Sequence, residues 1–256
     1  MGPVQETRID LGQEWKHGTP GAVLSWQPIM TQHLGIEIAA ICSFLSPALL
    51  FILIPLGIRL GRPGPVPIAF GDAEELKRLH ATKPGMLWLE SLSLAAPVTS
   101  LGAGYGWYWL VRGGAPDGAM GVVVWYLGMI FVIINDTLEL GLVATLPAQY
   151  QRADDTLKPA LLGFGAIVGY CIELFSLVGG LVSFSGVALI AISMLHVPSL
   201  PPWLGALGII ASVLILVSRI GTHLVRSLKP LGVLGLVGFI LFMTWILSTG
   251  IFTLRS

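Results

Sequence analysis

Charged side chains are scarce in this chain. Asp, Glu, Lys and Arg make up 11% of its 256 residues, and hydrophobic residues make up 54%. Soluble domains carry about 25% charged residues. The apolar runs are continuous and long enough to cross a bilayer, unlike the short alternating segments of a membrane barrel. The composition therefore excludes an ordinary soluble domain and predicts an all-α fold, a polytopic membrane helix bundle.

Groups that would hold a cofactor are also few. The two cysteines, Cys42 and Cys171, lie inside apolar runs without metal-ligand spacing, so we expect small packed thiols instead of a disulfide framework. No two histidines fall at mid-span positions on facing helices, which disfavours an embedded haem. The net charge is zero, so no nucleic-acid partner is expected. The sequence identifies no metal and leaves the cofactor unknown.

The apolar runs divide the chain into a tail and six spans. Residues 1–33 are polar and lack the pattern of a cleavable signal peptide. We therefore predict a polar N-terminal tail at 1–33 and a six-helix transmembrane domain at 34–256. The expected spans are residues 34–60, 86–111, 120–144, 160–195, 203–225 and 231–253. Between the first two, Asp72 to His80 predicts a short surface helix with Asp72 as N-cap and Glu75 in a capping box.

The fourth span is unusually long. As one helix, residues 160–195 would measure about 54 Å, against a hydrocarbon core of about 30 Å. One long helix is favoured. A re-entrant pair that breaks near Gly179 and Gly180 is the alternative.

Basic residues predict the orientation. Ten Lys and Arg residues, counted with the helix ends, fall on the side of loops 61–85, 146–159 and 226–230, and four fall on the other side. Basic loops stay in the cytoplasm, so both termini are predicted outside, with a bacterial inner membrane as the expected location. Five tryptophans then fall at the outer interface: Trp26, Trp107, Trp109, Trp125 and Trp203.

Six charged residues lie inside the expected spans. They are Glu37, Glu90, Asp136, Glu139, Glu173 and Arg219. Because successive spans alternate in direction, Glu37 falls near the outer surface and Glu90, Asp136, Glu139 and Arg219 fall in the inner half. Glu173 falls in the inner half or at the centre, so the five residues could share one layer. Charges inside hydrocarbon are expensive and mark functional sites by default.

Two interpretations of this layer remain open. In the first, Asp136, Glu139, Glu173 and Glu90 hold protons or a cation, because neighbouring carboxylates in a low dielectric cannot all ionise. Arg219 would then neutralise Asp136 or Glu139. In the second, the layer is a salt bridge that locks helices together, while Glu37 and Glu90 lie at helix ends in contact with water.

Three short motifs resemble a known family. They are Leu89-Glu90, the segment Leu138 to Gly141, and a long helix through Gly179, Gly180 and Gly186 that leads into residues 200–204. Together they resemble a bacterial family of small six-helix integral membrane proteins of unknown function, over roughly residues 34–250. The charged first loop and the outside N-terminus depart from what we expect of that family. The resemblance implies a membrane fold and no activity.

Three functions follow as hypotheses. The first is a proton- or cation-coupled transporter of a small solute, with Asp136 and Glu139 as coupling site and Arg219 as counter-charge. The second is a non-catalytic subunit or assembly factor of a larger membrane complex, which would add other membrane subunits to the lipid bilayer as partners. The third is an intramembrane enzyme that uses Glu139 or Glu173 as an acid on a lipid-like substrate.

Overall fold

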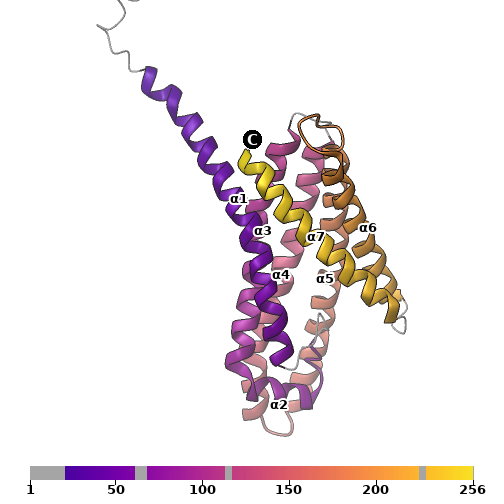
Figure 1. Ribbon diagram of the computed structural model, residues 1–256. Coiled ribbons are helices and arrows are strands. Elements are labelled where there is room, and N and C mark those ends of the chain that lie inside the picture. The colour runs from indigo at the N-terminus through magenta and orange to yellow at the C-terminus, as the bar shows by residue number, and fades with distance from the viewer. Residues whose placement is uncertain (1–20, 61–67, 113–116, 225–228, 256) are drawn as a thin grey trace, which may run out of the picture. The chain divides into compact units, whose positions relative to one another are not determined.

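The computed structural model describes residues 21–60, 68–112, 117–224 and 229–255, and every regular element in these ranges is a helix (Figure 1). Residues from Ile36 onward form one packed unit, and the helix residues before Ile36 belong to another. The helices are α1 Gly21–Arg59, α2 Ala73–Ala81, α3 Lys83–Val111, α4 Asp117–Arg152, α5 Lys158–Met194, α6 Pro202–Leu224 and α7 Lys229–Arg255. The predicted fold class, an all-α membrane helix bundle, is confirmed.

Five of these helices are long and apolar enough to cross a membrane: α4, α5, α6, and the segments His33–Arg59 of α1 and Leu231–Arg255 of α7. The remaining expected span coincides with α3, which has 29 residues. Helix α3 contains five Trp and Tyr residues, Glu90 and several glycines, which lower its hydropathy. Length and composition thus support five of the six predicted spans within the described ranges. Residues 1–20, 61–67 and 225–228 lie outside those ranges, and the tail boundary at residue 33 stays a prediction.

The outward faces of the long helices are apolar. Ile167 is 68% exposed, Val123 62% and Ile41 61%, and exposed leucines and phenylalanines accompany them on most helices. An apolar surface of this extent on a water-soluble protein would drive association. Hydrocarbon is the solvent that it fits, so the chain contacts the lipid bilayer.

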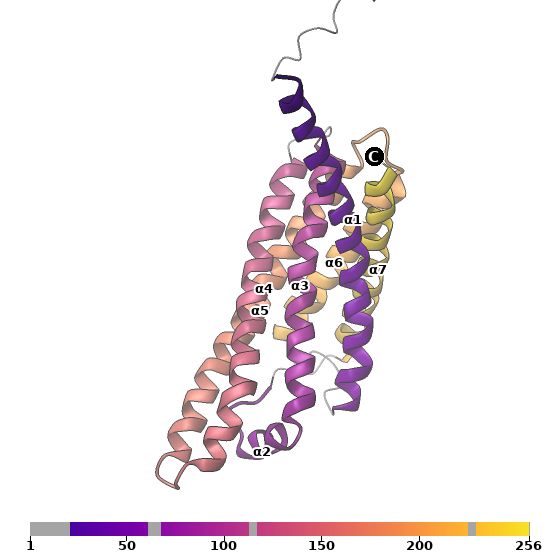
Figure 2. The same cartoon turned by 90° about the vertical axis from the view of Figure 1, so that its left-hand side faces the viewer.

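Helices α4 and α5 form one long antiparallel pair (Figures 1 and 2). Helix α5 has 37 residues without a break, about 55 Å, so the prediction of one long helix is confirmed. Glycines on both helices allow the backbones to touch. The close positions on α4 and α5 are 121 with 190, 125 with 186, 128 with 183, 132 with 179, and 146 with 165. Gly179 and Gly180 therefore pack against neighbouring helices and do not interrupt α5.

Helix α2 lies across the ends of α3 and α4 (Figure 2). Its two buried leucines, Leu76 and Leu79, join an apolar cluster with side chains of the long helices. Asp72 is the N-cap, as predicted, and its carboxylate accepts the backbone N–H of Glu74 at 2.9 Å. The capping box is corrected: Glu75 accepts from Arg78 Nε at 2.8 Å. The basic side chain one turn away binds Glu75 more strongly than a backbone amide would.

Two apolar cores follow one another along the bundle. The upper core lies at the C-terminal end of α3 and the N-terminal end of α4. It contains Trp107, Trp125 and Trp245 from three helices. The ring centroid of Trp107 lies 5.0 Å from that of Trp125 and 4.8 Å from that of Trp245. Trp107 Nε1 donates to Thr249 Oγ1 at 2.9 Å. Trp107 and Trp125 therefore pack inward and do not contact lipid, and their depth at the outer interface stays a prediction. Trp203 is exposed. The lower core surrounds α2.

The turn between α4 and α5 is fixed by one aspartate outside the membrane. Asp154 Oδ1 accepts from Thr156 Oγ1 at 2.7 Å and from the Leu157 N–H at 2.9 Å. These bonds, that of the Thr156 hydroxyl first, lower the pKa of Asp154 below its ordinary value.

Replacing Asp154 by Ala is expected to speed amide exchange at Thr156 and Leu157 several-fold at pH 6, measured by hydrogen–deuterium exchange. Because the folded-state pKa is lowered, the stabilisation is present above the ordinary aspartate pKa and is lost as pH falls through the lowered value. Asp155→Ala is the control, since Asp155 bonds to Lys158 Nζ and to neither amide. Equal exchange in both variants would contradict this role of Asp154.

Candidate functional site

Polar residues of α4 separate the two apolar cores. The upper core takes its last α4 residue at Met129, and the lower core takes its first at Leu142. The buried α4 residues between them are Asn135, Asp136 and Glu139. A buried helix face that is otherwise apolar thus becomes polar for about one turn.

The packing of α3 on α4 places Glu90 opposite Glu139. Three contacts set the register of this antiparallel pair, namely Val111 at Gly118, Gly104 at Trp125, and Ser100 Oγ donating to Met129 Sδ at 3.3 Å. Seven residues are about two helical turns. Two seven-residue steps from Gly104 lead to Glu90, and two from Trp125 lead to Glu139. Glu90 is 1% exposed and Glu139 is 6% exposed, so the register places two buried glutamates at the same level on adjacent helices.

Asn135 and Asp136 extend this pair by one turn. Asn135 Nδ2 donates to Asp136 Oδ1 at 2.9 Å. The buried Asn135 Oδ1 has no hydrogen-bond partner. Seven residues after Met129, Asp136 lies on the α4 face toward α3, whereas Asn135 follows Gly128 on the face toward α5. We call Glu90, Asn135, Asp136 and Glu139 the acidic layer.

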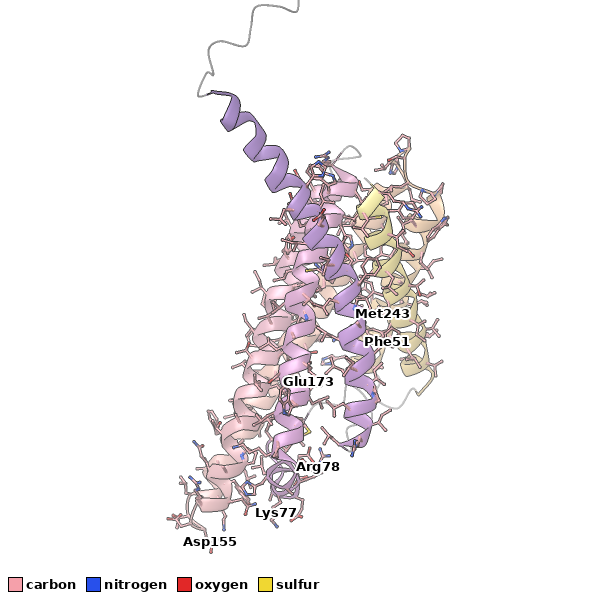
Figure 3. All side chains as sticks on the ribbon, turned by 60° about the vertical axis from the view of Figure 1, so that its left-hand side comes forward. Phe51, Lys77, Arg78, Asp155, Glu173 and Met243 are labelled. Atoms are coloured by element: carbon pink, nitrogen blue, oxygen red, sulfur yellow. The ribbon has the colours of Figure 1, made fainter. Side chains whose placement is uncertain are left out.

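Arg219 and Glu173 belong to a different contact, that of α5 with α6. Arg219 Nη1 donates to Ser176 O at 3.0 Å and to Ser176 Oγ at 3.2 Å. Its guanidinium group lies against Gly180. Glu173, Ser176 and Gly180 are spaced three and four residues apart, so they share one face of α5. Figure 3 places Glu173 above Arg78 and Lys77 of α2.

Two expectations about these charges are corrected. In the described part of the chain, Arg219 bonds to Ser176 and not to Asp136 or Glu139, because α6 packs on α5 and its arginine meets the nearer helix first. Glu90 does not lie in water at a helix end, because α2 and the lower core cover that end of α3. The five candidate residues thus divide into two groups: Glu90, Asp136 and Glu139 on one side of α5, and Glu173 with Arg219 on another.

Among the described residues, no three His, Cys, Asp or Glu groups lie close enough to hold one metal. A surface hollow of about 340 Å³ lies over Pro84, Leu87, Trp88 and Ser91, and a small one lies between Phe51 and Met243 (Figure 3). Neither hollow is lined by a residue of the acidic layer.

The residues matched by a family model include both groups of charged residues. The family described as "Domain of unknown function (DUF4386)" matches residues 38–250. The chain belongs to this DUF4386 family. The match includes most of α1 and all of α2 to α6, and therefore Glu90, Asp136, Glu139, Glu173 and Arg219. No curated protein and no solved structure matches the chain.

Proposed function

We propose that this DUF4386 protein is a membrane carrier that couples the movement of a small solute to protons, with Glu90 and Glu139 as the coupling pair. The observation that carries the proposal is the register of α3 on α4, which brings two buried carboxyl groups face to face between two apolar cores.

A facing pair of this kind binds protons as a unit. Two neighbouring carboxylates in a low dielectric oppose each other's ionisation, so protons bind to the two groups as a coupled pair. A carboxylate at this depth costs at least about 2.5 kcal/mol unless a counter-charge or water stabilises it. In this proposal a conformation that admits water favours proton exchange, and this dependence couples proton movement to the conformation of the carrier.

In this proposal, α2 and the lower core control the access of water to the acidic layer. Leu89 and Leu142, which neighbour Glu90 and Glu139 along the helices, pack in the lower core with Leu76 and Leu79 of α2. In this proposal α3 is the sixth membrane crossing and α2 lies on the cytoplasmic side. Separation of α2 from the lower core opens a water path to the pair from the cytoplasm.

The test is uptake into liposomes that contain the purified protein, with a panel of labelled amino acids, sugars and organic anions. We expect an imposed inward proton gradient to accelerate uptake of at least one class. Replacing both Glu90 and Glu139 by Gln should reduce this gradient-driven uptake at least tenfold, because neither side chain then exchanges a proton.

The matched control is Glu37→Gln, since Glu37 is exposed and outside the layer. This variant should keep the uptake of the unmodified protein. Gradient-driven uptake that persists in the double variant, or the absence of gradient-driven uptake for every class in the panel, would refute the proposal.

A further inference from the structure

Arg219 lies inside a membrane span, and two of its nitrogens make no hydrogen bond to the described residues. A guanidinium group carries five N–H donors. Those of Nη1 face the carbonyl and hydroxyl oxygens of Ser176. In the part of the chain that the structure describes, Nε and Nη2 make no hydrogen bond. These two nitrogens form one edge of the planar group, so the bonds to Ser176 leave that edge open.

The surroundings of Arg219 fix this orientation. A Cβ atom on Gly180 would lie 2.9 Å from Arg219 Nε and 3.0 Å from Cδ and Cζ. A side chain at position 180 would therefore displace the guanidinium group from its place on α5. Ser176, one turn away, holds Nη1 from both of its oxygens. The arginine is thus positioned before any ligand arrives, which lowers the entropy cost of binding.

We propose that Arg219 binds the anionic group of a ligand, a carboxylate or a phosphate, through Nε and Nη2. Two oxygens on one carbon or phosphorus atom match this edge, and such paired bonds are stronger than neutral ones. A positive charge inside a span is costly without a counter-charge, and within the described residues Arg219 has no carboxylate in an ion pair. A bound anion supplies the missing charge.

As an assignment of substrate class, this inference rests on the proposed function. A carrier that binds a singly charged anion at Arg219 and one proton at the Glu90–Glu139 pair moves no net charge. This balance favours a conformational change inside hydrocarbon. The anion site itself does not depend on proton coupling, because it follows from the α5–α6 contact alone. An experiment can therefore refute proton-driven uptake without refuting anion binding, and the reverse.

The experiment measures thermal unfolding by tryptophan fluorescence in nanodiscs made of phosphatidylcholine alone. Sodium succinate and sodium phosphate are the soluble probes, compared with sodium chloride at equal ionic strength. At about ten times Kd we expect the Tm of the unmodified protein to rise by about 3 °C. A second set of nanodiscs contains phosphatidylglycerol, whose headgroup phosphate is the alternative source of the anion.

Four variants connect the effect with the geometry. Arg219→Gln should abolish the Tm rise, and Arg219→Lys should reduce it severalfold, since lysine keeps the charge but lacks the paired donors. Gly180→Ala displaces the guanidinium group and should reduce the rise while keeping Arg219, which covers the case in which Arg219→Gln does not fold. Arg152→Gln, an exposed arginine at the end of α4, is the control and should keep the full rise.

A rise with succinate or phosphate that Arg219→Gln abolishes supports the site and assigns it to a solute anion. A rise only with phosphatidylglycerol that Arg219→Gln abolishes supports the site and assigns it to a lipid headgroup. No rise in either arm, or an equal rise in unmodified protein, Arg219→Gln and Gly180→Ala, would overturn the inference and leave Arg219 as a structural link to Ser176.

Discussion

Replacing Gly186 by Ala is expected to lower the stability of the bundle by about 3 kcal/mol, the upper part of the range for overpacked cores. A Cβ atom at position 186 would lie 2.5 Å from the backbone N of Trp125 and 2.7 Å from the carbonyl oxygen of Gly121. Both are backbone atoms of α4, so no side-chain rotation relieves the clash and the two long helices must separate. The change should appear as a fall in Tm of roughly 10 °C in detergent.

Gly163→Ala is the matched control. Gly163 lies on the same helix, but nothing lies within 4 Å of the place where its Cβ atom would be. Alanine favours the helix over glycine by up to about 1 kcal/mol, so the Tm of this variant should stay unchanged or rise slightly. A similar fall in Tm for both variants would show that the α4–α5 contact does not depend on Gly186.

The course of the helices could be predicted well because hydrocarbon imposes a simple rule on composition. The fifth expected span, 203–225, is observed as Pro202–Leu224, and Pro201 and Pro202 mark its start in the sequence. Prediction was poorer where tertiary contacts extend a helix beyond the apolar run. Helix α4 continues past residue 144 to Arg152, because Leu146 and Tyr150 pack in the lower core with α2. Hydropathy alone carries no signal of that contact.

For the charged residues, the sequence predicted depth but not direction. Alternation of the spans put Glu90, Asp136 and Glu139 in one layer, and the helix register agrees with that order. It also put Arg219 in the same layer and paired it with the acids, whereas the structure turns it toward Ser176. Depth depends only on position along a helix. Direction depends on which helix is the neighbour, and the contact of α6 with α5 became visible only in three dimensions.

The seven-residue spacing was the signal available in the sequence for the facing pair. Gly104 precedes Val111 by seven residues and follows Glu90 by fourteen, and Glu139 follows Trp125 by fourteen. A stripe of this period on two antiparallel neighbours brings its members together. Using the spacing required the knowledge that α3 and α4 are neighbours and that Gly104 meets Trp125.

Glu139→Gln is expected to leave the Tm within about 3 °C of the unmodified protein while it abolishes proton-driven uptake. Glutamine has the shape of a protonated glutamic acid and keeps a donor and an acceptor. If Glu139 carries or shares a proton with Glu90, the folded state loses little when the proton becomes permanent. Circular dichroism or tryptophan fluorescence during heating measures the Tm, and Glu90→Gln should behave in the same way.

The same substitution separates a working site from a lock between helices. If Glu139 were ionised and held by a buried cation, removing its charge would leave that cation unpaired and cost about 3–5 kcal/mol, visible as a fall in Tm of roughly 10 °C or more. Such a fall, with uptake lost only in proportion to the folded protein, would exclude the proton pair. Lost uptake at unchanged Tm would mean that the exchangeable proton of Glu139 matters to function and not to folding. This is the result that we expect for two buried glutamates at the same level on adjacent helices, between two apolar cores.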